Sequence, residues 1–436
     1  MSRISAASLA GGHRGGQPLL MEHRLITSAS KTEKFMKDVL IIGGGFAGVW
    51  SAAGAVRAAR EAGGAGDELR VTLVSGGDDL VIRPRLYEDA PEGMRVALDR
   101  VLGPIGVRRV TATVTGIDTG AHTVHAVGRA GEELDLAYDK LVLAAGSRLV
   151  RPDFPGARDI FDVDTLPAAA ALDSHLRRLP ERTPSQGRYT AVVVGAGFTG
   201  VEIATALGER LRAIADGEGA AEDVRVVLVD RAEVVGPELG PGPRPAIEEA
   251  IDELKIERRL GLTVASATRR DVTLSDGEVI PAATVVWTAG MAASSLTAQI
   301  PGERDRLGRL SVDAHLQVIG VPDVYAAGDT ALAPAEDGHS TVQSCQHALP
   351  MGKFAGHNVA ADLLGNALLP FTPDPYTTCL DLGSAGAVFT EGWDRRIALT
   401  GPEAKTLKQN INALWIYPPT DDPEQILAQA GRFSNG

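Results

Sequence analysis

Two copies of one glycine pattern constrain the fold of this chain more than any other feature of its 436 residues. GGGFAG begins at Gly43 and GAGFTG begins at Gly195, which places the copies 152 residues apart. Each copy follows a short apolar run and precedes a run rich in small residues, a pattern that predicts a buried strand, a tight turn and a helix. An internal repeat of this kind predicts an α/β chain built from two similar units.

Both copies satisfy the spacing G-x-G-x-x-G, in Gly43, Gly45 and Gly48 and again in Gly195, Gly197 and Gly200. The first glycine permits a tight turn, the second lets a pyrophosphate approach the backbone, and the third lets the helix pack closely on the strand. The helix N-terminus then faces the phosphates. We therefore predict two nested Rossmann-like dinucleotide-binding domains, each with three layers, and a small C-terminal α+β region.

The length of the chain predicts two or three domains, because a single hydrophobic core rarely grows beyond about 250 residues. A stretch rich in proline and arginine over 148–187 is a plausible crossing between two of them. We predict a disordered N-terminal extension over 1–37, a split first dinucleotide-binding domain over 38–155 and 305–370, a second dinucleotide-binding domain over 156–304, and a C-terminal interface region over 371–436.

Shorter patterns predict individual elements. Strands are expected over 70–75, 110–118, 122–127, 138–147 and 224–230, a return strand over 310–331, and helices over 166–179 and 343–365. In the C-terminal region one helical face carries Leu407, Ile411, Leu414 and Trp415. We expect this face to pack on the body of the protein or on a second subunit rather than on lipid, so the chain is predicted to be a monomer or a homodimer and peripheral membrane contact is not favoured.

The composition excludes several classes of protein. The formal net charge of −13 argues against nucleic-acid binding, since phosphates need a basic surface. No run of about 18 apolar residues is present, so no transmembrane segment is expected. The two cysteines, Cys345 and Cys379, lack the spacing of a metal site or a disulfide framework. We therefore predict a cytoplasmic protein without a metal, in which both cysteines are small buried hydrophobic residues.

The residue that ends the second strand of each unit bears on which dinucleotide binds. Asp230 can accept both adenosine ribose hydroxyls and repels the 2′-phosphate of NADP, or else it merely begins a turn. The neighbouring Arg231 weakens the preference, because an arginine can pair with that phosphate. In the first unit Ser75 takes the place of the acid and can bond one ribose hydroxyl. We predict NAD(P)H, with NADH preferred, at the second unit, and keep NAD at both units as an alternative.

Three further segments complete a resemblance to a known family: LVLAAGS over 141–147, TVVWTAG over 284–290 and DVYAAGD over 323–329. With the two glycine patterns they resemble the FAD-dependent pyridine nucleotide-disulfide oxidoreductase family over about residues 38–365. The resemblance implies FAD at the first unit, with contacts from Gly146, Gly328 and Asp329, the last of these to the ribityl chain. It implies NAD(P)H at the second unit, with Gly290 nearby.

The first helix indicates the branch of the family. It reads FAGVWSAAGAVRAAR and contains no cysteine, whereas the disulfide-reductase branch has two there. The chain looks most like the type II NADH dehydrogenase branch, through Glu202 in GFTGVE and through VIRPRLYE over 81–88. The resemblance implies that Glu202 faces the nicotinamide, that Pro84 fixes the loop under the flavin and that Arg83 or Arg85 shapes the acceptor side. A helix-dipole role for Glu202 and an ordinary salt bridge for either arginine are the alternatives.

A last segment, QSCQHALPMG over 343–352, resembles the one whose helix N-terminus points at the flavin and stabilises its reduced form. His347 lies here as a candidate proton donor or as a packing residue. We predict an FAD-dependent oxidoreductase that takes hydride from NAD(P)H, with Glu202 and His347 as candidate catalytic residues and a quinone-like or other small acceptor. The alternatives are a redox-responsive binding protein and a soluble enzyme that acts on an organic intermediate.

Overall fold

The computed structural model describes residues 36–433. The predicted N-terminal extension lies outside this range except for its last two residues, and the first strand, β1, already begins at Lys37. Within the described range no helix combines the length and the apolarity needed to cross a membrane.

The first sheet has seven strands, and its centre is a parallel layer buried on both faces. Val39 and Ile41 of β1 are fully buried, as expected for a strand covered by helices on both sides. The strand order is β19 (Val324–Ala326), β8 (Lys140–Leu143), β1 (Lys37–Ile42), β2 (Leu69–Ser75), β5 (Arg108–Asp118), β6 (Thr123–Gly128) and β7 (Glu133–Ala137). The last three strands form the antiparallel meander whose first hairpin the sequence predicted.

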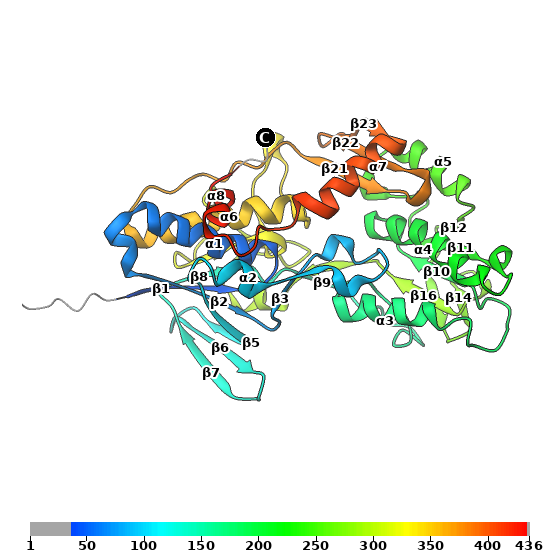
Figure 1. Cartoon of the computed structure of the whole chain (residues 1–436), viewed down its shortest axis with the longest axis horizontal. Coiled ribbons are helices and arrows are strands. Elements are labelled where there is room, and N and C mark those ends of the chain that lie inside the picture. The colour runs from blue at the N-terminus through cyan, green and yellow to red at the C-terminus, as the bar shows by residue number, and fades with distance from the viewer. Residues whose placement is uncertain (1–35, 434–436) are drawn as a thin grey trace, which may run out of the picture. The chain divides into compact units, whose positions relative to one another are not determined.

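Two helices far apart in the chain pack against each other beside this sheet. They are α1 (Phe46–Glu61) and α6 (Cys345–Leu364), and Figure 1 shows them side by side. Small residues allow the close approach: a Cβ on Gly356 would lie 2.1 Å from the carbonyl oxygen of Ser51. Because β19 pairs with β8, residues beyond 320 complete the sheet that begins at Lys37.

The second sheet is entirely parallel, in the order β12 (Glu257–Leu260), β11 (Arg225–Asp230), β10 (Thr190–Val194) and β16 (Thr284–Trp287). Its helices are α3 (Leu166–Arg177), α4 (Phe198–Asp216) and α5 (Arg244–Glu253). A small antiparallel sheet follows, formed by β13 (Val264–Ala267), β14 (Asp271–Leu274) and β15 (Val279–Pro281). The two sheets have parallel strands at their centres, and a strand of each sheet leads into one glycine pattern, which confirms the predicted α/β class.

The first part of the C-terminal region lies over α4, whereas its last helix packs against α1 (Figure 1). The region has an antiparallel sheet of β21 (Thr377–Asp381), β22 (Ala387–Glu391) and β23 (Arg396–Thr400), and the helices α7 (Gly401–Asn410) and α8 (Pro423–Ala430). A π-helical turn over Ile411–Trp415 continues α7. This arrangement agrees with the predicted α+β character of the region.

The expected packing of the C-terminal apolar face on the body of the protein holds for Ile411, which packs against the core, but not for Leu414 and Trp415. Leu414 and Trp415 are 64% and 59% exposed, and the buried positions are Ala404, Lys408 and Asn412. The reason is that Lys408 and Asn412 find polar partners in the interior, so a polar stripe of the helix turns inward and the two large apolar residues turn outward.

The expected return strand over 310–331 is also wrong as a single element. It consists of β18 (Leu310–Ser311), β19 and β20 (Ala331–Leu332), separated by turns in which Leu316 and Gly320 have φ of 67° and 82°. Left-handed residues interrupt an extended strand. The remaining short elements are β3 (Asp79–Val81), β4 (Arg95–Ala97), α2 (Leu98–Leu102), β9 (Ser147–Leu149) and β17 (Met291–Ala293).

Candidate dinucleotide-binding sites

The first glycine pattern forms a tight turn between β1 and α1 with open space above it. Gly43 has φ of 118°, and a Cβ on Gly48 would lie 1.9 Å from the carbonyl oxygen of Gly43, so both positions accept only glycine. A Cβ on Gly45 would meet no heavy atom within 4 Å. The turn is therefore closely packed at Gly43 and Gly48 and has free space beside Gly45. At that space the N-terminus of the helix favours a phosphate.

Ser75, at the end of β2, lies beside this turn. A Cβ on Gly44 would lie 2.6 Å from its hydroxyl oxygen, and the N–H of Gly77 donates to that oxygen at 3.4 Å. The hydroxyl is thus adjacent to the glycine turn, where the sequence expected a ribose contact.

Asp329 lies at the carboxyl edge of the same sheet, after β19. Its side chain is 16% exposed and accepts a hydrogen bond from the hydroxyl of Ser147 at 2.6 Å, with the guanidinium of Arg83 at 3.7 Å. Burial raises the pKa of Asp329, and Ser147 and Arg83 oppose that rise. A carboxylate held in this way is an acceptor for hydroxyl groups of a ligand.

Two neighbouring glycines complete the surroundings of this edge. Gly328 has φ of 67°, and a Cβ there would lie 2.8 Å from the Cβ of Ala47 in α1. Gly146 has φ of 68° and open space at its Cβ position. The donor set, the close backbone approaches and the free space all fit a flavin dinucleotide along this edge.

The arginines of VIRPRLYE have different surroundings. Arg83 forms an ion pair with Asp164 and donates to the hydroxyl of Ser147 at 2.9 Å, which links it to Asp329. Arg85 pairs with Glu88 at 2.6 Å and donates to the hydroxyl of Tyr417 at 3.0 Å. The geometry therefore favours Arg83 over Arg85 as the arginine that shapes the flavin site, and favours the salt-bridge interpretation of Arg85. Pro84 lies between them in the first turn of a short helix.

His347 lies in the first turn of α6, and Ser344 caps that helix. Its Nδ1 accepts from the N–H of Val342 at 3.2 Å, and its Nε2 is buried without a hydrogen-bond partner among residues 36–433. The ring stacks on Tyr376 with a centroid distance of 5.6 Å. Burial lowers the pKa of His347, so the ring is neutral at physiological pH. These contacts favour packing, and a role as proton donor stays a prediction.

The second glycine pattern repeats the geometry of the first between β10 and α4. Gly195 has φ of 111°, and a Cβ on Gly200 would lie 1.6 Å from its carbonyl oxygen. Above Gly197, however, the space is taken: a Cβ there would lie 2.0 Å from Oε1 of Glu238. That carboxylate accepts from the N–H of Phe198, the first residue of α4, at 3.2 Å.

Asp230 ends β11 beside the second turn. Its two carboxylate oxygens accept from the N–H of Ala196 at 2.6 Å and from the N–H of Ala232 at 2.7 Å. Arg231 is exposed. Gly290, with φ of 83°, accepts a hydrogen bond from the N–H of Val150, which lies in the predicted domain crossing. Asp230 is thus fixed at the position from which an acid reaches an adenosine ribose.

Glu202, in the second turn of α4, is buried against the C-terminal region. Its Oε1 lies 2.8 Å from Nζ of Lys408 and accepts from the N–H of Asp381 at 3.1 Å. Burial raises the pKa of Glu202, and the charge of Lys408 opposes the rise. The geometry therefore gives Glu202 a specific cationic partner, which the sequence did not suggest.

Polar groups extend from this pair toward VIRPRLYE. The hydroxyl of Tyr87 donates to Asp381 at 2.9 Å, and Asn412 donates to the hydroxyl of Tyr87 at 3.3 Å. We call Glu202, Lys408, Asp381, Tyr87 and Asn412 the buried polar cluster. It joins α4, α7 and the segment after β3 through residues that sequence spacing could not bring together.

The two cysteines are both unpaired and half-buried. Burial raises the pKa of Cys345 and raises that of Cys379 to about 11, so neither is a reactive thiolate at neutral pH.

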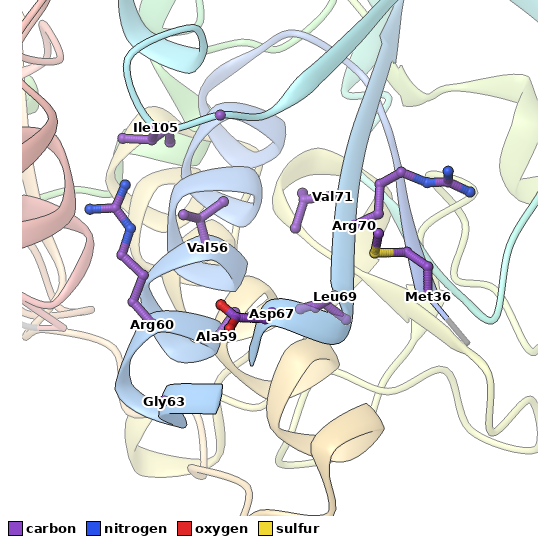
Figure 2. Close-up of a pocket in the computed structure, with 11 residues that line it drawn as sticks. Met36, Val56, Ala59, Arg60, Gly63, Asp67, Leu69, Arg70, Val71 and Ile105 are labelled. Atoms are coloured by element: carbon purple, nitrogen blue, oxygen red, sulfur yellow. The ribbon is translucent and has the colours of Figure 1, made fainter. Parts of the chain in front are cut away.

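A cavity of about 460 Å³ lies away from both glycine turns (Figure 2). Val56 and Arg60 of α1 line one side, and Leu69 and Val71 of β2 line the other. Met36, before β1, also lines it, whereas Gly43 follows the opposite end of that strand. Since a six-residue strand spans roughly 20 Å, this cavity is not a dinucleotide site.

Comparisons with known proteins agree with this geometry. The family model for pyridine nucleotide-disulphide oxidoreductases matches residues 37–352. An NADH dehydrogenase-like protein of Mycobacterium tuberculosis is 48% identical over 397 residues, which cover 91% of this chain and 98% of that protein. A type II NADH:quinone oxidoreductase of the same species is 30% identical over 349 residues, which cover 71% of this chain and 70% of that protein.

Solved structures show the same fold. The structure of NDH2 from Plasmodium falciparum in complex with NADH has a TM-score of 0.74 and covers 91% of this chain and 97% of its own. The two sequences are 13% identical, so this likeness concerns the fold alone.

Proposed function

The chain belongs to the pyridine nucleotide-disulphide oxidoreductase family, and on this premise we propose that it is an NADH:quinone oxidoreductase. As a member it is an FAD-dependent NAD(P)H oxidoreductase. The observation that carries the proposal is the pair of glycine turns, each at the carboxyl edge of its own parallel sheet and each at a helix N-terminus. FAD, when bound at the first turn, accepts hydride from the nicotinamide and passes electrons to an acceptor.

The residues of the chain bind and orient the two dinucleotides. Gly45 and the N-terminus of α1 bind the flavin pyrophosphate, and Asp329 accepts hydroxyls of the ribityl chain. Asp230 accepts the adenosine ribose hydroxyls and disfavours a 2′-phosphate, which makes NADH the preferred donor. Glu202, held by Lys408, is proposed to stand on the nicotinamide side.

A quinone as the acceptor is supported by the buried polar cluster and by the relative that is 30% identical, a type II NADH:quinone oxidoreductase. Reducing a quinone requires two protons as well as two electrons, and the hydroxyl of Tyr87 is a donor connected to Asp381. Leu414 and Trp415 are exposed beside Asn412, so an apolar acceptor has an apolar surface to approach. We propose that the protein is cytoplasmic and that its contact with a membrane surface is limited to Leu414 and Trp415.

Steady-state oxidation of NADH with a water-soluble quinone, and separately with ferricyanide, tests the proposal. Ferricyanide takes electrons without protons. For Tyr87→Phe we expect the rate with quinone to fall about tenfold, the order of one hydrogen bond or one weakened proton transfer, and the rate with ferricyanide to stay unchanged. Quinone turnover no faster than the reaction with oxygen alone would contradict a quinone acceptor.

A further inference from the structure

The carboxylate of Glu238 occupies the position where the second glycine turn should bind a pyrophosphate. Its Oε1 lies against Gly197 and accepts from the N–H of Phe198. In a dinucleotide fold that amide and the helix N-terminus are the phosphate ligands. An anion from the chain itself therefore takes the place of the phosphate, and a dinucleotide must displace it.

The backbone of the loop that carries Glu238 is held by a hydrogen bond, whereas the Glu238 side chain is exposed. The N–H of Gly236 donates to the carbonyl of Ala196 at 2.8 Å, and Leu239 is 2% exposed. Gly236 and Gly240, with φ of 57° and 77°, flank the short helix Pro237–Leu239. The backbone is anchored to the glycine turn, whereas the Glu238 side chain is exposed and free to turn toward solvent.

The C-terminal region places a cation near the first residue of α4. Arg395, in the turn between β22 and β23, has its guanidinium carbon 6.0 Å from the ring centre of Phe198 and 5.0 Å from that of Tyr376. Its Nη1 is buried and has no hydrogen-bond partner in the described part of the chain. A buried guanidinium N–H without an acceptor costs free energy. A ligand that supplied a hydrogen-bond acceptor to it would therefore gain binding free energy.

The backbone holds Arg395 in place at a disfavoured conformation. Its φ of 58° is left-handed, which side chains with a Cβ rarely adopt. Its carbonyl oxygen would lie 2.8 Å from a Cβ on Gly242, so the turn rests against the loop after Glu238. Trp393 in the same turn stacks on Tyr376 at 4.1 Å and on His339 at 4.3 Å. These contacts hold the turn in the position that places Arg395 beside the first residue of α4.

We propose that Arg395 is a ligand of the dinucleotide pyrophosphate at the second site, and that Glu238 holds the phosphate position until the dinucleotide displaces it. This inference rests on the proposed function, since it takes the second turn as the site of the nicotinamide dinucleotide. A guanidinium offers paired N–H donors that match phosphate oxygens. The carboxylate accepts from the N–H of Phe198 and competes with any incoming anion for that amide.

Binding of ADP-ribose, which has the pyrophosphate but cannot transfer hydride, tests the inference by calorimetry on the FAD-loaded protein. For Arg395→Gln we expect affinity to fall tenfold or more, about the effect of a charge-assisted hydrogen bond. For Glu238→Gln we expect it to rise about threefold to tenfold, as one competing charge is removed. Arg396→Gln, next in the chain and paired with Glu391, and Glu249→Gln, exposed on α5, are the matched controls and should change affinity less than twofold.

Adenosine, which lacks phosphates, separates a lost ligand from a damaged site. Its affinity should be the same in wild type, Arg395→Gln and Glu238→Gln, and Arg395→Lys should bind ADP-ribose with intermediate affinity. Equal ADP-ribose affinity in wild type and Arg395→Gln, or an equal loss for adenosine, would overturn the role of Arg395. Unchanged affinity in Glu238→Gln would overturn the role of Glu238. A wild-type protein that binds no ADP-ribose would instead refute the nicotinamide site and with it the proposed function.

Discussion

The amine of Lys408 in α7 lies 2.8 Å from the carboxylate of Glu202 in α4, and each side chain is 9% exposed. The C-terminal region is thereby tied to the second dinucleotide-binding unit by a buried ion pair. Burial lowers the pKa of Lys408, but the charges of Glu202 and Asp381 more than offset this, so the amine remains protonated. Removing one partner leaves the other charge buried and uncompensated, which is far more costly than losing a surface pair.

Lys408→Met should therefore destabilise the protein by about 3–5 kcal/mol, measured as the free energy of unfolding in denaturant. Burial raises the folded-state pKa of Glu202, and without Lys408 the strongest opposition to that rise is lost, leaving the hydrogen bond from the N–H of Asp381. A raised pKa favours the protonated folded form, so the deficit should shrink as pH falls from 8 toward 5. Lys405→Met, which removes a 28% exposed lysine from Asp381, is the control and should cost less. A pH-independent deficit would contradict this account.

Gly45 and Gly48 lie three residues apart in the first turn and should respond differently to alanine. Gly48→Ala forces a Cβ to 1.9 Å from a carbonyl oxygen, so the protein should lose several kcal/mol of stability or fail to fold. Gly45→Ala adds a methyl group to open space and should leave the thermal midpoint of the flavin-free protein unchanged, while the flavin content on purification falls. Full flavin occupancy in Gly45→Ala would show that the pyrophosphate binds elsewhere.

Asp230 determines the preference between NADH and NADPH in our account. Asp230→Asn keeps oxygen and nitrogen atoms near the amides of Ala196 and Ala232 but removes the negative charge. We expect kcat/KM for NADH to fall about tenfold and that for NADPH to rise, because a 2′-phosphate is no longer repelled and Arg231 lies next in the chain. Steady-state rates with both donors check this, and an unchanged ratio of the two would contradict it.

Lys353, in α6, should make the free energy of unfolding increase as the pH rises above about 8. It is 4% exposed, and burial lowers its pKa to about 8. Its Nζ donates to the carbonyl of Arg432 at 2.8 Å. Between pH 8 and the ordinary lysine pKa of about 10.5, the unfolded chain holds a proton that the folded chain has lost, so stability rises with pH by up to about 3 kcal/mol. Lys353→Met should remove this part of the slope in denaturant midpoints taken at pH 7 and pH 10, and an identical slope in both proteins would contradict the prediction.

Local pattern explains which parts of this architecture could be predicted from sequence. The two glycine turns, the strands before them and the hairpin of β5 and β6 all follow from spacing within a few residues. The resemblance then identified the two cofactors. The domain boundaries and the roles of the site residues remain predictions, although the geometry places Asp329, Ser75 and Asp230 beside the expected turns.

Partners that are distant in the chain could not be predicted. Lys408 and Arg395 lie in a region with weak patterns, and only the packing of α7 and of the β22–β23 turn on α4 brings them to the second site. The apolar pattern of α7 did not predict the inward-facing polar stripe, because Glu202 and Tyr87, the partners of Lys408 and Asn412, lie far away in the chain. Contacts of this kind need the fold.

Anaerobic titration of the purified protein with NADH, followed through the visible spectrum, tests the central claim most directly. We predict a yellow protein whose flavin absorption bleaches stoichiometrically with NADH and needs a higher concentration of NADPH for the same effect. Addition of a quinone should restore the oxidised spectrum. A colourless protein that cannot be reconstituted with FAD, or bound flavin that neither nicotinamide reduces, would contradict the account.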